Sequence, residues 1–484
     1  MRLHPDTQVA RRIDAVAFRH ERIEYLPIDE IKPYPGNART HDENQITVLM
    51  ASMKTFGFTN PALLDGDNVL IAGHGRVEAA RRLGMETVPV LWIEGLSPDQ
   101  VRAYRISDNR IAELAGWDGQ ILAIELQHLA SIDIHFPIEV TGWSSAEIDV
   151  LIENAASGED EEDPADIIPP LTKTAISRPG DLWLMGPHRL LCGSALETGC
   201  YERLMQGEKA VLVCQDPPWN IAVKTISGSG KTKHREFVMG SGEMSEAEFR
   251  KFLQTQLACN LACVEPGAVF QVFIDWRGVE KVITAGTALG LELLNVCVWH
   301  KGHGSFGSPW RSAHELIVCF RVPGAPIRDR VKMGKHGRIR SNVWEVPGMG
   351  SFGKGREAAL AMHPTSKPVR LLTEAIRDVT DRGDIVLDAF MGSGSCLIAA
   401  HRTGRVARGL ELDPLYVDTV VRRWQDLTGQ VATLDGDGRS FADIAAARGE
   451  EGVGQTGTRP PVRHRVRVSP PATANAGMEM SDVG

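Results

Sequence analysis

The chain has 484 residues, 43% of them hydrophobic and 24% charged, so it can bury substantial cores; at about 150 residues per domain, roughly three domains are expected. The net charge of −9 excludes a uniformly basic DNA-packing protein but leaves open nucleic-acid binding through local positive clusters. No apolar run could span a membrane, no signal peptide opens the chain, and the cysteines form no CxxC pair, so we expect a cytoplasmic protein without membrane partner, disulfide framework or metal.

Residues 20–150 are predicted to form a small α+β domain with a helical extension. Apolar residues at helical spacing predict a helix from Gln45 to Phe56. Short apolar runs predict strands at 62–64, 69–71 and 88–93. A second helix, over 77–83, is opened by a glycine-rich turn at 73–76.

Two segments have the composition of linkers. Residues 151–179 are acidic and rich in proline, without apolar periodicity, which predicts a linker. Residues 449–484 contain few large apolar side chains and are expected to be a disordered tail.

Residues 180–448 alternate strands and helices, which is typical of an α/β sandwich. Continuously apolar, β-branched runs predict strands covered on both faces at 211–214, 269–274, 316–320 and 385–387. Helices are predicted between them and after them, at 246–263, 368–380, 396–403 and 414–427.

A glycine turn after the predicted strand at 385–387 is a candidate cofactor site. It has the sequence Asp388-Ala389-Phe390-Met391-Gly392-Ser393-Gly394 and leads into a helix, whose N-terminus offers free N–H groups. About twenty residues later the next strand ends in Glu411, where an acid can accept both hydroxyls of a ribose. Since the loop lacks a lysine and a third glycine, these features favour a nucleoside over a pyrophosphate.

A candidate reaction site, Asp216-Pro217-Pro218-Trp219, follows the strand at 211–214. The two prolines fix the backbone and remove N–H donors, so carbonyl groups can face outward as acceptors. A carboxylate and a fixed carbonyl can hold both hydrogens of an exocyclic amine, and Trp219 can stack on a base. We expect this segment and the glycine turn to end neighbouring parallel strands and to share one cleft.

Four motifs in a fixed order resemble the beta subgroup of amino-group DNA methyltransferases. The tetrapeptide matches their catalytic motif, 388–394 their cofactor loop, Glu411 their ribose acid, and His363-Pro364-Thr365-Ser366-Lys367-Pro368 a segment that lines the same pocket. The resemblance implies a Rossmann-like domain that uses S-adenosyl-L-methionine. It also implies cofactor binding by Ser194, Lys367, Asp388, Phe390, Gly392, Gly394 and Glu411. Ser194 stands where family members usually carry an aspartate, which suggests the hypothesis of a weaker cofactor affinity.

The resemblance further implies methyl transfer to a base extruded from double-stranded DNA. Asp216 and the Pro217 carbonyl would polarise the amine while Trp219 stacks on the ring, without a covalent enzyme intermediate. An aspartate at the first position of the tetrapeptide resembles adenine-N6 enzymes, so we expect site-specific methylation of adenine. Cytosine-N4 methylation stays open.

Residues 321–340 carry seven basic side chains against one acid, Asp329. In a chain of net negative charge, this local reversal favours contact with DNA phosphates, and it lies where beta-subgroup enzymes have their target-recognition region, here about 321–350. A solvated basic loop is the alternative. The predicted DNA-binding residues are Arg328, Arg330, Lys332, Lys335, Arg338 and Arg340.

Residues 20–118 resemble the ParB/sulfiredoxin-like fold through two boxes, at 37–39 and 73–82. In partition proteins the second box holds nucleotide phosphates, which implies a nucleotide partner bound by Arg39, Gly73, Gly75 and Arg76. His74 stands where sulfiredoxin chemistry needs a cysteine, so redox repair is excluded. The alternative interpretations are a DNA-docking domain and a purely structural accessory domain. A homodimer is a further possibility for the chain.

A second class of function competes with methyl transfer: a ParB-type partition clamp with a non-catalytic methyltransferase-like domain. Such a clamp needs a helix-turn-helix after the second box, and residues 117–152 show no clear one. It would also leave the catalytic motifs unexplained. The sequence therefore favours a DNA methyltransferase with an accessory domain.

Overall fold

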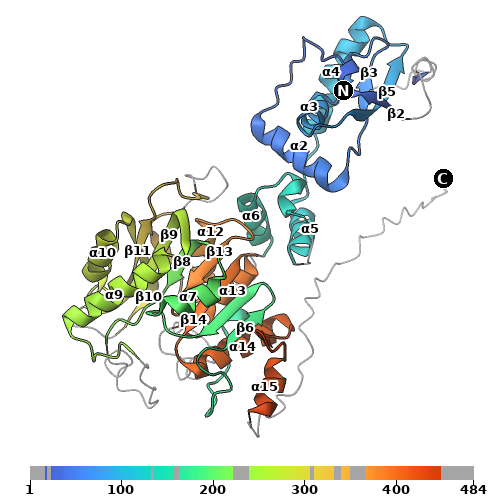
Figure 1. Ribbon diagram of the computed structural model, residues 1–484. Coiled ribbons are helices and arrows are strands. Elements are labelled where there is room, and N and C mark those ends of the chain that lie inside the picture. The colour runs from blue at the N-terminus through green and yellow to red at the C-terminus, as the bar shows by residue number, and fades with distance from the viewer. Residues whose placement is uncertain are drawn as a thin grey trace, which may run out of the picture.

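The computed structural model describes residues 17–18, 23–131, 136–156, 163–221, 239–305, 310–331, 340–348 and 366–448. Within these ranges the chain forms a five-stranded sheet in its N-terminal part and a ten-stranded sheet in its C-terminal part (Figure 1). No helix in the described ranges is long and apolar enough to cross a membrane. The predicted tail at 449–484 lies outside the described residues.

The N-terminal sheet has the strand order β1-β5-β3-β4, with β2 also paired to β5. Helix α2 begins where the Asp42 carboxylate accepts a hydrogen bond from the Gln45 N–H, and α3 begins after Gly73, whose φ of 98° suits glycine. The helices and strands predicted here are confirmed. The elements are β1 (Ala17–Phe18), β2 (Glu24–Pro27), η1 (Ile28–Glu30), α2 (Glu43–Phe56), β3 (Ala62–Leu64), β4 (Leu70–Ala72), α3 (His74–Arg82), β5 (Thr87–Glu94) and α4 (Pro98–Glu113).

A helical pair follows in the chain. Helices α5 (Gly119–Ser131) and α6 (Ser145–Ala156) flank the short η2 (Ile138–Thr141). Leu126, Ile138 and Ile148 form the small buried core between these elements. They provide the helical extension that the sequence suggested.

The second half of the expected linker is packed against the C-terminal domain. The Asp418 carboxylate accepts hydrogen bonds from the N–H groups of Ile176 and Ser177, at 2.6 and 2.9 Å. Asp166, in η3 (Pro164–Asp166), accepts one from the Val369 N–H at 2.8 Å. Residues 163–179 are therefore part of the folded domain rather than a free linker. Residues 157–162 lie outside the described ranges.

The large sheet has the strand order β12-β10-β11-β9-β8-β13-β14-β7-β6-β15. Strands β9, β8, β13, β14 and β7 are mutually parallel, and antiparallel strands flank them on both sides. The strands are β6 (Leu182–Met185), β7 (His188–Cys192), β8 (Ala210–Gln215), β9 (Val264–Ile274), β10 (Glu292–Ser305), β11 (Ser312–Arg321), β12 (Val343–Glu345), β13 (Ile385–Asp388), β14 (Val406–Glu411) and β15 (Thr433–Leu434).

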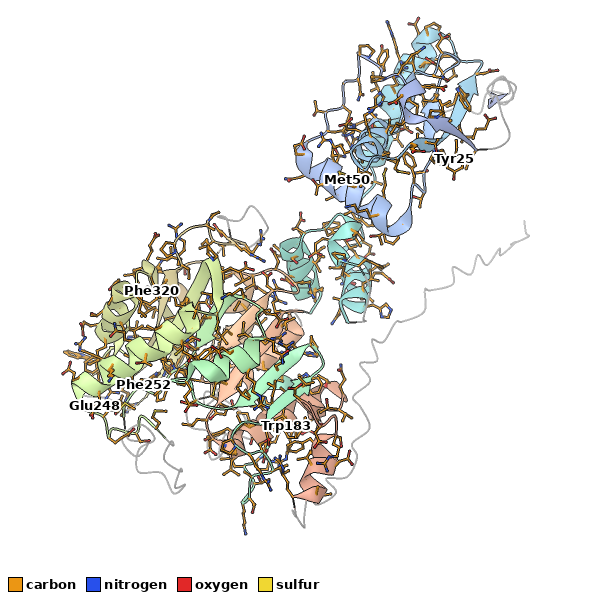
Figure 2. The ribbon with its side chains drawn as sticks, in the orientation of Figure 1. Tyr25, Met50, Trp183, Glu248, Phe252 and Phe320 are labelled. Atoms are coloured by element: carbon orange, nitrogen blue, oxygen red, sulfur yellow. The ribbon has the colours of Figure 1, made fainter. Side chains whose placement is uncertain are left out.

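Helices cover both faces of this sheet, which explains why its central strands are apolar throughout. Phe252 of α9 and Phe320 of β11 belong to one core cluster, and Trp183 of β6 belongs to the cluster on the other face (Figure 2). The predicted Rossmann-like α/β class is confirmed. The helices are α7 (Thr198–Met205), α9 (Glu246–Leu261) and α10 (Val279–Ala288) on the first face, and α12 (Val369–Arg377), α13 (Ser395–Arg402), α14 (Pro414–Thr428) and α15 (Phe441–Ala447) on the second.

Candidate active site

Strands β8 and β13 are parallel neighbours, with Leu212 opposite Val386 and Val213 opposite Leu387. The carboxyl ends of parallel neighbours meet at one edge of a sheet, so the segments that follow them lie side by side. One pocket is accordingly lined by both. The prediction that the two motifs share a cleft is confirmed. The predicted residues that line this pocket are Asp216, Pro217, Pro218, Trp219, Lys367, Asp388, Phe390, Gly392 and Glu411.

Two acids at the β13–β14 side of the pocket are held by backbone donors. Glu411 accepts hydrogen bonds from the N–H groups of Gly392 and Asp413, at 2.7 and 2.8 Å. Asp388 accepts one from the Phe390 N–H at 2.9 Å. Burial raises the pKa of Asp388 and that of Glu411 to about 7 each. Both carboxyl groups can therefore bind hydroxyl groups or a cation of a ligand.

Two predicted cofactor residues do not line the pocket. A Cβ at Gly394 would lie 2.9 Å from Val420, so this glycine lets the turn pack against α14. The Ser194 hydroxyl accepts a hydrogen bond from the Leu196 N–H at 3.2 Å and so closes its own turn. Its neighbours Gly193 and Ala195 line the pocket instead.

At the β8 side of the pocket, Asp216 forms part of a charged network. Its Oδ1 accepts a hydrogen bond from Trp219 Nε1 at 3.2 Å, and its Oδ2 contacts the Lys367 ammonium. The same ammonium lies 3.2 Å from Glu315 Oε2, and Lys301 Nζ lies 3.0 Å from Glu315 Oε1. Lys367, predicted to bind the cofactor, thus contacts the catalytic-motif carboxylate.

Burial and charge act in opposite senses within this network. Burial raises the pKa of Asp216, and the nearby Lys367 ammonium counteracts part of that rise. Burial would lower the pKa of Lys367, but Asp216 and Glu315 outweigh it and hold that pKa above its ordinary value. Burial would raise the pKa of Glu315, but Lys367 and Lys301 hold it lower. The network therefore favours a Glu315 carboxylate and a protonated Lys367, and it makes Asp216 a stronger base than an exposed aspartate.

Sequence reasoning assigned no role to Glu315 or Lys301. Glu315 precedes the apolar run at 316–320, and Lys301 lies on β10, the strand paired with it. A charged side chain that continues a fully buried strand needs a partner, and that requirement was the signal available in the sequence.

Two thiols lie in the pocket, and one of them, that of Cys396, is held in its protonated form. The two thiols belong to Cys214 and Cys396. Hydrogen bonding to Cys214 and burial raise the pKa of Cys396 well above its ordinary value, so it stays a thiol. All eight cysteines are free. In the part of the chain that the structure describes, no group of three or more His, Cys, Asp or Glu side chains could hold a metal ion.

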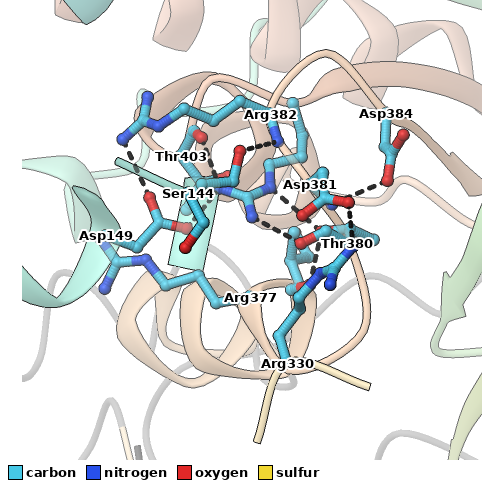
Figure 3. A network of polar contacts seen from close by, with 12 residues as sticks. Ser144, Asp149, Arg330, Arg377, Thr380, Asp381, Arg382, Asp384 and Thr403 are labelled. Carbon is cyan, nitrogen blue, oxygen red and sulfur yellow. Dashed lines mark hydrogen bonds and ion pairs between the residues drawn. The ribbon is translucent and has the colours of Figure 1, made fainter. Parts of the chain in front are cut away.

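Three of the predicted DNA-binding arginines lie at the opposite edge of the sheet. Arg328 forms ion pairs with Asp384 and Glu265, the latter at 3.2 Å. Arg330 pairs with Asp381, beside the Asp149–Arg382 pair (Figure 3).

Arg340, the third, pairs with Asp378 and Glu374, at 3.2 and 3.3 Å. The acids that pair with these arginines lie on α12 or just after it, shortly before β13, or at the start of β9. They therefore lie at the edge of the sheet where the parallel strands begin, which we call the amino edge. The pocket lies at the opposite edge. These three arginines are therefore already paired with carboxylates, and their contact with DNA phosphates stays a prediction. Lys332, Lys335 and Arg338 lie outside the described residues.

The predicted nucleotide-binding residues of the N-terminal domain do not share one role. Arg39 lines a second pocket, next to Tyr34 and Arg105, and pairs with Glu113 at 3.1 Å. Gly73 caps α3, and a Cβ at Gly75 would lie 3.0 Å from the His41 ring. The Arg76 guanidinium contacts the Pro61 carbonyl at 3.5 Å, while its Nε is buried without a partner among the described residues.

Three family models match the chain in succession. A ParB N-terminal domain covers residues 13–113, a ParB-methyltransferase HTH domain covers 120–179, and a DNA methylase covers 211–422. The second match shows that our expectation of no helix-turn-helix was wrong. Helices α5 and α6 are separated by η2 rather than by the usual three- to four-residue turn, so the pattern is not recognisable from spacing.

Curated relatives each match part of the chain. The ParB-like nuclease domain-containing protein YnaK of Escherichia coli is 49% identical over 79 residues, 16% of this chain and 91% of YnaK. The type II methyltransferase M2.DpnII of Streptococcus pneumoniae is 25% identical over 45% of this chain and 84% of its own length. M2.MboI of Moraxella bovis is 27% identical, and the chain spans 57% of that relative.

Solved structures of DNA methyltransferases match about half of the chain. A putative DNA modification methylase from Thermus thermophilus, complexed with S-adenosyl-L-methionine, has 23% identity and a TM-score of 0.35 over 49% of this chain and 93% of its own. The PvuII DNA methyltransferase, cytosine-N4-specific, has 19% identity and a TM-score of 0.38 over 57% and 94%. The family matches thus identify residues 211–422 as a DNA methylase domain of the N6/N4 class, preceded by a ParB-like domain at residues 13–113.

Proposed function

We propose that this chain is a site-specific methyltransferase that transfers a methyl group from S-adenosyl-L-methionine to N6 of adenine in double-stranded DNA. One observation carries the proposal: the corner at Asp216 and the glycine turn at Gly392 follow adjacent parallel strands and line one pocket. An amine-binding carboxylate and a nucleoside-binding turn are thereby within reach of one another.

The pocket fits the proposed cofactor. S-Adenosyl-L-methionine, when bound, supplies a methyl group on a positively charged sulfur. Glu411 can accept the ribose hydroxyls, and the buried Asp388 can bind a positively charged group of the ligand. Phe390 offers an apolar wall for the adenine ring.

The reacting base would be held by the tetrapeptide. Asp216 and the Pro217 carbonyl would accept hydrogen bonds from the target amine, and Trp219 would stack on the base. As the nitrogen–methyl bond forms and the methyl–sulfur bond breaks, the nitrogen must release one proton, which the Asp216 carboxylate can accept. Lys367 cannot accept it, because its pKa is held above the ordinary value.

Adenine is proposed over cytosine because an aspartate begins the tetrapeptide. The test is transfer of a labelled methyl group to unmethylated DNA, followed by mass analysis of the nucleosides. We expect N6-methyladenine. N4-methylcytosine as the product would overturn the choice of base and leave the reaction class standing.

The Asp216→Ala variant tests the proposed site. We expect turnover to fall by about a thousandfold or more, while the cofactor affinity changes only a few-fold, since the carboxylate acts on the reacting amine. Asp437→Ala, an exposed aspartate paired with Arg439, is the matched control. Near-normal turnover in Asp216→Ala would refute the assignment.

We propose, second, that the ParB-like domain binds the phosphates of a nucleotide near Arg39. Arg39, Arg102 and Arg105 line one pocket there, which gives it a positive wall. Calorimetric titration with nucleoside triphosphates is expected to show binding that Arg39→Ala weakens at least tenfold. Equal affinity in both proteins would exclude this site.

A further inference from the structure

The buried lysine of the active site occupies a place that the target amine needs. Lys367 is only 6% exposed, and its ammonium contacts Asp216 Oδ2, while Trp219 holds Oδ1. Both carboxylate oxygens therefore have a donor before any base arrives. Since a carboxylate is an acceptor of limited capacity, an incoming amine has to share or displace the Lys367 contact.

Glu315 offers the ammonium a second partner on the same face of the sheet. Side chains alternate between faces along a strand, so Glu315 shares its face with Ile317, which lies opposite Phe273 of β9. Lys367 shortly precedes α12, which covers this face. The ammonium can therefore stay paired with Glu315, 3.2 Å away, when it gives up its contact with Asp216 Oδ2.

Two further groups define the surroundings of the ammonium. It lies 5.4 Å from the centroid of the Trp219 ring and 5.5 Å from that of Phe273, so aromatic faces surround the cation on two sides. Lys301 holds the other oxygen of Glu315 at 3.0 Å. Glu315 is itself 9% exposed and is thus fixed between two lysines.

We propose that Glu315 is a positioning residue for methyl transfer: it retains the Lys367 ammonium while the target amine takes over the Oδ2 atom of Asp216. Lysine suits this exchange, because its ammonium has three donors on a flexible stem and can turn from one carboxylate to another. The inference rests on the proposed function of Asp216.

The proposal predicts opposite pH effects for two variants. Among the described residues, the charged groups facing Asp216 are Lys367, Glu315 and Asp388. In Glu315→Gln, Lys367 keeps Asp216 as its one carboxylate partner in this network, so the pKa of Asp216 falls and the acid limb of kcat moves to lower pH. In Lys367→Met, Asp216 loses its cation and keeps the repulsion of Glu315, so the acid limb moves to higher pH.

The experiment compares pH profiles of kcat for the full chain on unmethylated DNA. For Glu315→Gln we expect kcat at neutral pH to fall roughly tenfold to a hundredfold, with an acid limb about one pH unit lower and an unchanged cofactor affinity. Lys301→Met removes a more distant cation, so it should move the limb in the direction of Lys367→Met, to higher pH, by less. A fold defect cannot produce shifts of opposite sign in Glu315→Gln and Lys367→Met.

Two outcomes would overturn the inference. One is an acid limb that stays in place in Glu315→Gln, whatever the loss of rate; the other is an unchanged kcat. Failure of the proposed function looks different, because then Asp216→Ala would keep its turnover or the wild-type chain would transfer no methyl group.

Discussion

The two edges of the catalytic sheet handle buried charge in different ways. At the amino edge, arginines meet carboxylates: Arg328 pairs with Asp384, Arg330 with Asp381, and Arg405 with Asp149. At the carboxyl edge, Asp388 and Glu411 accept backbone hydrogen bonds, and neither forms an ion pair among the described residues. Paired charges join segments of the fold, whereas buried acids without a cation leave room for a ligand that supplies one.

This comparison of the two edges separates charges that stabilise the fold from charges that are available for function. An ion pair at the amino edge ties α6 or the 321–331 segment to the start of a central strand. The acids at the carboxyl edge cost the unliganded domain stability, because burial disfavours their charged forms. Costs of this kind are typical of binding sites.

The largest effect is expected at the amino edge, in Arg405→Met. Arg405 is 1% exposed, pairs with Asp149 at 2.7 Å and donates to Thr380 and to the Thr403 carbonyl. Its removal leaves buried acceptors without a donor, so we expect a loss of about 3 kcal/mol in the free energy of unfolding. Denaturant unfolding followed by tryptophan fluorescence measures it.

Arg402→Met is the matched control for Arg405→Met. Arg402 lies close by in the chain but is exposed and pairs with Asp163 at the surface. Its loss should cost less than about 1 kcal/mol. Equal losses in the two variants would show that burial does not distinguish the pairs at this edge.

The second-largest effect is expected at the carboxyl edge, in the pH dependence of the free energy of unfolding. The pKa of Asp388 is about 7 in the folded domain against an ordinary value of 3.8, so the folded state binds more protons than the unfolded chain between these values. Stability of the unliganded protein should therefore fall as the pH rises from about 4 to about 7, by up to about 1.4 kcal/mol per pH unit from this group.

Asp388→Asn removes this titration and should reduce the pH dependence, to which Glu411, also with a pKa of about 7, still contributes. Unfolding free energies of wild type and variant at pH values of about 5.5 and about 7.5, without cofactor, are the measurement. Asp437→Asn, at the surface, should leave the wild-type slope unchanged. If Asp388→Asn keeps that slope as well, burial of Asp388 does not destabilise the unliganded domain.

The sequence predicted the carboxyl edge better than the amino edge, for a physical reason. Asp216, Gly392 and Glu411 belong to contiguous motifs at strand ends, and parallel neighbours bring strand ends together. The arginines of 321–340 looked free because their acids lie far along the chain, around the end of α12 and before β13. Charge composition counts such groups and cannot show which of them are already paired.

The same limit explains what was missed at the reaction site. Lys367 was placed with the cofactor because its motif lines the same pocket, yet its partners follow β8 or lie on β11. The helix-turn-helix escaped notice since η2 separates α5 from α6. Both features depend on contacts between elements, which local spacing does not encode.

The smallest effect is expected in the DNA affinity of Arg330→Gln, a variant at the amino edge. The Arg330 guanidinium pairs with Asp381, and its backbone N–H donates to the Asp378 carbonyl at 3.0 Å, at the edge away from the pocket. DNA affinity of this variant should therefore stay within about twofold of wild type, with an unchanged salt dependence, since the guanidinium neutralises a carboxylate rather than a phosphate.

The comparator for Arg330→Gln is the combined change of Lys332, Lys335 and Arg338 to glutamine, for which phosphate contact stays a prediction. If all three touch phosphates, the slope of log affinity against log salt should fall by about 2.7, at about 0.9 for each phosphate no longer neutralised. Fluorescence anisotropy of labelled duplex DNA across a salt series measures both variants. A slope reduced by about 0.9 in Arg330→Gln would mean that the arginine leaves Asp381 for DNA, and the amino edge would then share in binding rather than only in folding.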